Sequence, residues 1–141
     1  MTAPSALFAA QHVLLEQRMA TREAETAAAF EAAEAGLDWA LGMLNGRSRV
    51  DPHCQPADGS GALSFRDHML ARDSTSGRFL PTGREVRCRG SGDLGWSCRC
   101  GANDDVVATP AADVGPAFRV GFAPDEARDV AWVHAIGCNR A

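Results

Sequence analysis

Lysine and tyrosine are absent from this chain of 141 residues, and all fourteen basic side chains are arginine. We attribute this bias, together with the abundance of alanine, to a GC-rich coding sequence rather than to a function. The net charge of −4 is mildly acidic. It therefore predicts no binding to nucleic acid or to an anionic membrane surface, both of which favour basic proteins. A chain of this length fits one domain with a modest core.

Signals for export and membrane insertion are also missing. Residues 1–15 contain no basic start, no apolar stretch and no small-residue cleavage site of a signal peptide. The longest early apolar run, residues 6–10, is far shorter than the ~20 residues that cross a bilayer. Taken literally, the chain starts in the cytosol. We favour the alternative that a membrane-inserting piece ahead of Met1 is missing, because this also explains the cysteines described below.

Catalytic motifs are lacking as well. The chain has no G-x-S-x-G, no phosphate-binding glycine loop and no H-E-x-x-H. The four histidines are scattered, and we expect each to be solvent-exposed or satisfied by a structural hydrogen bond: His12, His53, His68 and His134. We therefore expect no enzymatic activity, no catalytic residue and no cofactor.

The most informative feature present is a very long helical pattern. No proline interrupts residues 5–44, and apolar side chains recur there at helical spacing, namely Phe8, Leu15, Met19, Phe30, Leu37, Leu41 and Leu44. About 40 residues at 1.5 Å each form a rod of roughly 60 Å, whereas most domain helices have three or four turns. Such a rod must bury its surplus surface against something outside this chain.

The helical pattern carries two apolar faces. We expect the C-terminal members of the stripe above to cover a sheet. A second set lies roughly opposite, and consists of Leu7, Leu14, Ala28, Ala32, Ala35, Trp39 and Met43. Either the following loop folds over Trp39 and Met43, or both faces are buried among several copies or partners. Small side chains allow helices to approach closely.

We therefore predict a helix-packing interface that draws on both faces. Its members are Leu7, Leu14, Ala28, Phe30, Ala32, Glu34, Ala35, Leu37, Trp39 and Met43. Glu34 lies at the edge of the first stripe. Its expected role is that of a solvated residue, with an interface hydrogen bond as the alternative.

The rest of the chain predicts an α+β domain. Residues 1–45 form the helix, which ends at Asn45-Gly46, and residues 46–84 form a connecting loop with one helical turn or short strand near residues 63–70. Residues 85–141 change to a period of two and predict a small antiparallel sheet. Its candidate strands lie at residues 85–89, 96–100, 118–122 and 130–136. The C-terminal half of the helix packs on this sheet and the N-terminal half projects.

Five cysteines are many for a cytosolic protein of this size and indicate an oxidising compartment: Cys54, Cys88, Cys98, Cys100 and Cys138. Cys98 and Cys100 share one strand face in a geometry unsuited to a mutual disulfide, so each should pair with a different segment. Fifteen patterns of two bridges remain open. We expect two disulfides that staple loop, sheet and C-terminal strand. The odd thiol suggests that Cys138 has lost a partner outside this chain.

Metal and redox sites are weaker alternatives. Zinc ligands could come from His53, Cys54, Cys88, Cys98, Cys100 and His134. However, structural zinc sites usually contain C-x₂₋₄-C, which is missing, and redox catalysis lacks its C-x-x-C. Calcium candidates do not follow the EF-hand spacing; they are Asp51, Asp58, Asp104 and Asp105.

Several segments resemble PilX-type minor pilins of type IV pili. In the helix they are Leu15-Glu-Gln-Arg-Met-Ala20, Ala29-Phe-Glu-Ala-Ala-Glu-Ala-Gly-Leu37 and Trp39-Ala-Leu-Gly-Met-Leu44. In the second half they are Trp96-Ser-Cys-Arg-Cys100, Phe118-Arg-Val-Gly-Phe122 and Gly137-Cys138. The likeness covers the helix and the sheet, and leaves residues 46–83 unaligned.

The resemblance implies a pilin-like fold and a structural role. Such a subunit is held in the inner membrane, facing the periplasm, before it joins an extracellular pilus. Its partners are other minor and major pilins and the pilus assembly machinery, and it acts in priming at the tip. The family's type III leader, first glutamate and hydrophobic segment have no counterpart here, so no residue receives those roles. The chain also stops soon after Cys138, earlier than the family leads us to expect.

Two other functions remain open. The first is a surface adhesion or cell-aggregation module, presented on a pilus, whose loop 46–83 and sheet edge bind a ligand. The second is a cytosolic zinc-binding or redox protein.

Overall fold

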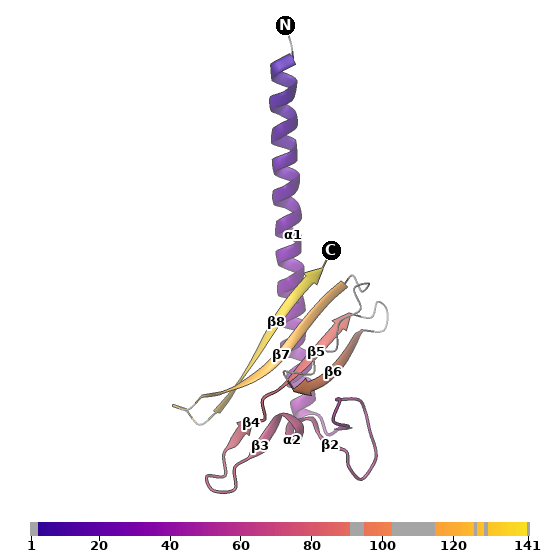
Figure 1. The fold of residues 1–141 in the computed structure, drawn as a ribbon, viewed down its shortest axis with the longest axis vertical. Helices are drawn as coiled ribbons and strands as arrows, with labels where there is room; N and C mark the ends of the chain where they lie inside the picture. Colours follow the sequence, from indigo (N-terminus) through magenta and orange to yellow (C-terminus); the bar gives the residue numbers. More distant parts are fainter. Residues whose placement is uncertain (1–2, 91–94, 103–114, 126, 129, 141) are drawn as a thin grey trace.

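One unbroken helix dominates the fold. The computed structural model describes residues 3–90, 95–102, 115–125, 127–128 and 130–140, with side chains described from residue 13 to residue 139 of these ranges. Helix α1 spans Ala3–Asn45 and has 43 residues, a length of about 65 Å at 1.5 Å per residue. Its lower part lies on a sheet and its upper part extends beyond it (Figure 1). The predicted long helix is confirmed.

Helix α1 ends where the sequence predicts. The N–H of Gly46 donates to the carbonyl of Gly42 at 2.8 Å. The side chain of Asn45 donates to the carbonyl of Leu41 at 2.9 Å. The Gly46 bond satisfies one of the four carbonyl groups that the last turn of a helix leaves without partners.

The main sheet is antiparallel and has four strands in the order β6-β5-β7-β8. The strands are β5 (Arg84–Gly90), β6 (Trp96–Ala102), β7 (Gly115–Asp125) and β8 (Val130–Arg140). Each contains one of the four segments predicted from the period of two. The α+β class, with a long N-terminal helix and a small antiparallel sheet, is therefore confirmed.

Residues 46–84 contain more structure than the predicted loop. Strand β1 (Arg49–Val50) pairs with β2 (Leu63–Ser64), and β3 (Leu70–Arg72) pairs with β4 (Phe79–Pro81). Between the two pairs lies α2 (Phe65–Met69), which is the predicted helical turn. The short strands were missed because two or three residues are too few to show an alternating pattern.

Ser64 fixes the start of α2. Its hydroxyl oxygen accepts the backbone N–H of Asp67 at 3.2 Å and donates to the Asp67 carboxylate at 2.7 Å. This reciprocal arrangement is an N-terminal cap. It directs Phe65 and Met69 inward, where both are fully buried. The helical turn thus closes the end of the core.

Trp39 of α1 contacts both α2 and the main sheet within the core. Its ring lies 5.3 Å from that of Phe65 in an edge-on arrangement and 6.3 Å from that of Phe118 on β7. Edge-on and tilted aromatic pairs of this separation are favourable beyond the area they bury. Of the two alternatives for the Trp39 side of the helix, the structure has the segment after the helix contact Trp39, and the sheet contacts it as well.

Small residues set the distance between α1 and the sheet. A Cβ on Gly137 of β8 would overlap the carbonyl oxygen of Ala29 and lie 2.6 Å from the backbone nitrogen of Ala33. A Cβ on Gly36 would lie 2.8 Å from the Phe118 ring. Backbone therefore meets backbone where the helix crosses β8, and only glycine fits there.

The predicted orientation of α1 was wrong. The C-terminal members of the first stripe were expected to cover the sheet, but Phe30, Leu37 and Leu41 are exposed to 64%, 37% and 50%. Leu44 alone among these members is half-buried and packs against the core. The opposite side packs on the sheet instead, with Ala32 and Ala40 almost fully buried. The physical reason is the close approach: a large side chain at these positions would hold the helix away from β8.

Candidate interaction surfaces

The upper part of α1 is an exposed shaft. Every described side chain from Val13 to Ala27 is exposed, including Leu14, Leu15 and Met19 at 53–64%. With the residues before them, these positions extend about 40 Å beyond the packed part of the helix. We call residues 3–27 the shaft. Its large apolar side chains have no cover within the described part of this chain.

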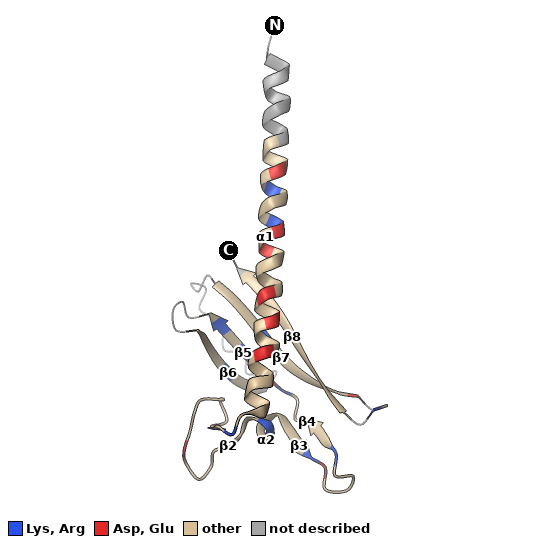
Figure 2. Ribbon diagram, turned by 180° about the vertical axis from the view of Figure 1, so that it is seen from behind, with Lys and Arg blue, Asp and Glu red and all other residues tan. Residues whose placement is uncertain are grey.

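The solvent side of the packed half carries both apolar and acidic groups. Phe30, Leu37 and Leu41 form an apolar stripe. Beside it, three exposed carboxylates follow at spacings of three and four residues, namely Glu31, Glu34 and Asp38. Figure 2 views this side, with α1 in front of the sheet. We call the two sets together the outer face of α1.

The predicted interface residues thus divide into two groups. Leu14, Phe30, Glu34 and Leu37 are exposed and available to a partner. The others lie on the side that packs within the chain and are buried or half-buried: Ala28, Ala32, Ala35, Trp39 and Met43. The chain's own sheet and α2 cover part of that side, and a partner interface at these five residues stays a prediction. The side chains of Leu7 and Phe8 lie outside the described residues.

Two disulfides staple the sheet. Cys54 is bonded to Cys100 and Cys88 to Cys98, while Cys138 is a free, exposed thiol. The prediction of two disulfides is confirmed. The prediction that Cys98 and Cys100 belong to different disulfides is confirmed as well. The expected staple to the C-terminal strand was wrong, because Cys138 on β8 takes no part. Cys88 and Cys98 are instead direct cross-strand partners of β5 and β6.

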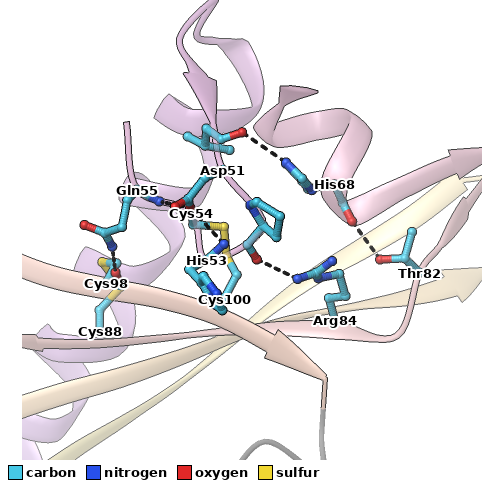
Figure 3. Close-up of a disulfide and its surroundings, with 12 residues drawn as sticks. Asp51, His53, Cys54, Gln55, His68, Thr82, Arg84, Cys88, Cys98 and Cys100 are labelled. Atoms are coloured by element: carbon cyan, nitrogen blue, oxygen red, sulfur yellow. Dashed lines mark hydrogen bonds between the residues drawn. A yellow bond between two sulfur atoms is a disulfide. The ribbon is translucent and has the colours of Figure 1, made fainter. Parts of the chain in front are cut away.

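The Cys54 bridge holds a compact turn (Figure 3). The carboxylate of Asp51 accepts the backbone N–H groups of His53 at 2.8 Å and Gln55 at 2.9 Å. Cys54 itself has a φ of 63°, an uncommon conformation for a residue with a side chain. The turn and the disulfide together fix this conformation.

The same turn covers one edge of the sheet. The N–H of Cys100 donates to the carbonyl of His53 at 3.1 Å, and the side-chain amide of Gln55 donates to the carbonyl of Cys98 at 2.6 Å. Edge strand β6 thereby has hydrogen-bond partners outside the sheet. At the other edge, β8 pairs with β7 and with no other strand of the described residues.

Acid is expected to weaken the Asp51 turn. The N–H groups of Gln55 and His53, with the nearby His53 ring, lower the pKa of Asp51 below its ordinary 3.8. A lowered folded-state pKa gives stability that is complete above the ordinary value and is lost as the pH falls through the folded value. We therefore expect the difference in melting temperature between wild type and Asp51→Asn to be smaller at pH 3 than at pH 5. An unchanged difference at pH 3 would contradict this assignment. The pKa of Asp73 is also lowered, but Asp73 is present in both proteins, so its titration cancels in the comparison.

Four of the candidate zinc ligands are not free thiols in this structure. Cys54, Cys88, Cys98 and Cys100 are all in disulfides, and a disulfide sulfur is not the thiolate that zinc requires. Across the described residues no group of three or more histidine, cysteine or acidic side chains is placed to hold a metal. Asp104 and Asp105 lie outside those residues.

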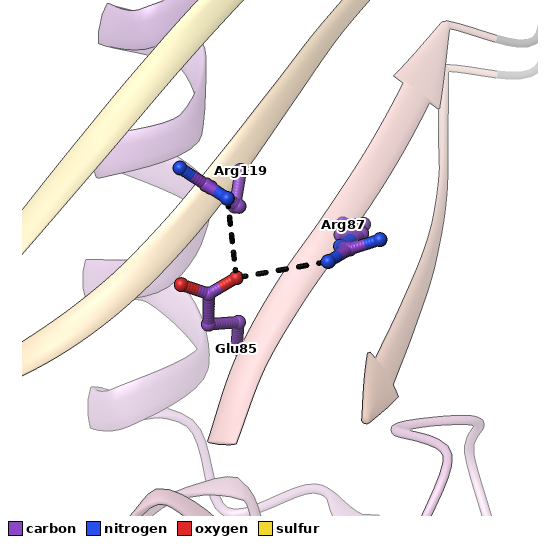
Figure 4. A network of polar contacts seen from close by, with 3 residues as sticks. All are labelled: Glu85, Arg87 and Arg119. Atoms are coloured by element: carbon purple, nitrogen blue, oxygen red, sulfur yellow. Dashed lines mark ion pairs between the residues drawn. The ribbon is translucent and has the colours of Figure 1, made fainter. Parts of the chain in front are cut away.

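The sheet face turned away from α1 carries a row of arginines. Arg99 on β6 lies directly opposite Arg87 on β5, which lies directly opposite Arg119 on β7. Each of these side chains is exposed. Glu85 lies between two of them, 4.0 Å from Arg87 and 3.6 Å from Arg119 (Figure 4). We call the three arginines the arginine row; sequence reasoning missed it.

Comparison with known proteins finds no match for this chain. No protein-family model, no curated protein and no solved structure matches this chain. Within the described residues, no helix has the length and apolar character needed to cross a membrane.

The outer face of α1 should be dispensable for folding. Replacing Phe30, which is 64% exposed, by serine is expected to change the free energy of unfolding by less than about 0.5 kcal/mol, the usual range for surface substitutions. Serine and phenylalanine also have similar helix propensities. The matched control on the buried side is Ala40→Leu, for which overpacking should cost about 2 kcal/mol. Urea unfolding measures the free energy of unfolding of both variants. Equal losses of stability would show that the outer face is packed.

Proposed function

We propose that this chain is a structural subunit of a type IV pilus, similar to the PilX-type minor pilins, and that its shaft packs among the helices of other pilins. The exposed shaft is the observation that carries the proposal. A helix gains most of its stability from burying an apolar face, and this one presents Leu14, Leu15 and Met19 to solvent. A bundle of pilin helices supplies the missing cover.

The disulfides support the compartment that this function requires. Cys54–Cys100 and Cys88–Cys98 are bonds of an oxidising environment. We place the subunit at the periplasmic side of the inner membrane before assembly and in the extracellular pilus afterwards. Its proposed role there is priming at the tip.

Photo-crosslinking in the producing cells tests this proposal. A photoreactive phenylalanine analogue at Met19 should join the chain to other pilins, because Met19 is on the shaft. The same analogue at Gly59 is the control, since Gly59 is an exposed loop residue with open space around it. Crosslinks at Gly59 alone, or products of Met19 that contain no pilin, would contradict the proposal.

Adhesion or cell aggregation is the second candidate, and the β3–β4 hairpin favours it. This hairpin lies at the end of the molecule opposite the N-terminus (Figure 1). It exposes Phe79 to 49% and Leu80 to 40%, an apolar pair at the end of a subunit. If the hairpin binds a surface, Phe79→Ser with Leu80→Ser should abolish attachment or aggregation while the subunit still enters pili. Unchanged attachment would remove this candidate.

A further inference from the structure

We propose that the arginine row of one copy of this chain binds the outer face of α1 of a second copy, so that the globular parts stack front to back. This contact joins the globular parts of two copies. It rests on the proposed function only in that the array would form within a pilus. It is carried by the charge, the apolar surroundings and the dimensions of the two surfaces.

Within the described residues, the arginine row has one ion-pair partner, the carboxylate of Glu85. Like charges directly opposite each other destabilise a sheet, and here Arg87 faces an arginine on each side. Among the described residues, Glu85 is the acidic group that forms ion pairs with the row, and three arginines with one glutamate leave a charge of +2. This surface therefore favours an anionic partner.

The outer face of α1 has the negative charge that such a partner requires. Glu31, Glu34 and Asp38 contribute −3, and no basic residue occurs on the helix between Arg22 and its end. The two surfaces are also similar in length. Glu31 and Asp38 are about 10 Å apart along the helix axis, and three neighbouring strands place Arg99 and Arg119 about 10 Å apart as well.

Both charged sets have exposed apolar neighbours. On the sheet, Ile136 of β8 lies directly opposite Arg119 and is 46% exposed. On the helix, Phe30 and Leu41 flank the carboxylates. Contact between the surfaces would bury apolar groups on both sides while the opposite charges set the orientation.

The two surfaces lie on opposite sides of the molecule. In Figure 1 the sheet lies in front of the lower part of α1, and in Figure 2, from behind, α1 lies in front of the sheet. A contact between two different surfaces is heterologous, and one that does not close into a ring extends as an open array. Stacking of this kind therefore suits a filament rather than a closed dimer.

A charge-exchange experiment on the whole chain tests the inference. One variant combines Arg87→Glu, Arg99→Glu and Arg119→Glu, and the other combines Glu31→Arg, Glu34→Arg and Asp38→Arg. Sedimentation velocity measures association at 50 mM salt and at 500 mM salt, with circular dichroism to confirm that both variants are folded.

Wild type should associate at 50 mM salt, and 500 mM salt should weaken this association at least about tenfold because exposed charge pairs are screened. Each variant alone should be monomeric, since its two surfaces then carry the same sign. The mixture of the two variants should associate again, because every contact between unlike variants is complementary.

Three outcomes would overturn the inference. They are a monomeric wild type at 50 mM salt, a mixture that does not associate, and heparin binding at the arginine row without association of the protein. The last would assign the row to a polyanion. None of them affects crosslinking from Met19, so failure here is distinguishable from failure of the proposed function.

Discussion

Gly137→Ala is expected to lower the free energy of unfolding by about 3 kcal/mol, although it adds a single methyl group. Overpacking typically costs 1–3 kcal/mol, and the upper end applies because the obstacle is backbone. The added Cβ would overlap the carbonyl oxygen of Ala29 and crowd the nitrogen of Ala33. Neither atom can move without lifting α1 from β8, which also separates Trp39 from Phe118.

Gly115→Ala is the matched control for this change. Gly115 lies on the neighbouring strand β7, and a Cβ there meets no atom within 4 Å. We expect it to change stability by less than about 0.5 kcal/mol. Thermal unfolding should show a melting temperature about 10 °C lower for Gly137→Ala, with little change for Gly115→Ala. Similar melting temperatures for both variants would contradict the close contact of helix and sheet.

Removing the Cys54–Cys100 disulfide, by replacing both cysteines with alanine, is expected to cost about 4 kcal/mol. The bridge joins residues 46 apart in sequence, and the loop-closure relation gives about this value for a loop of that size. A loss of this size is comparable with the total stability of many domains. It also removes the covalent link between the Asp51–Gln55 turn and edge strand β6, which then remain joined by hydrogen bonds alone.

The second disulfide provides the comparison. Cys88 and Cys98 are 10 residues apart, so the same relation gives about 3 kcal/mol for their replacement by alanine. These residues are also direct partners on hydrogen-bonded strands, which hold them together without the bond. Chemical unfolding of the two double variants should therefore rank the Cys54–Cys100 variant as less stable. The reverse order would show that the loop bridge is not the main staple.

Much of the fold could be predicted from the sequence, because its signals are local. A stretch without proline and with helical spacing specifies α1, and alternating residues such as Val86 and Cys88 specify strands. The helix stop at Asn45-Gly46 is equally local. Each of these patterns depends on neighbouring residues along the chain, so no knowledge of the tertiary structure was needed.

The parts that could not be predicted depend on distant residues. The side of α1 that packs inward is decided by the fit of Gly36 and Ala33 against the sheet, which requires the strand order. A glycine within a strand, such as Gly137, was the available signal of a close approach. The Cys88–Cys98 pairing likewise follows from the β5–β6 register, and the Cys54–Cys100 pairing follows from the position of the Asp51–Gln55 turn on β6.

The arginine row had no signal in the sequence apart from its alternation with buried residues. Arg87, Arg99 and Arg119 are widely separated along the chain, and only the pairing of three strands brings them into line. The net acidic charge hid this local basic surface. Total charge therefore does not describe either the arginine row or the acidic outer face of α1.

Hydrogen exchange of the shaft tests the central claim most directly. Backbone amides of residues 13–27 should exchange rapidly in the isolated chain, because no other described element packs against them. In sheared pili that contain this subunit, the same amides should exchange at least about tenfold more slowly, since neighbouring helices cover them. Equal exchange of residues 13–27 in the isolated chain and in pili would contradict the claim that other subunits cover the shaft.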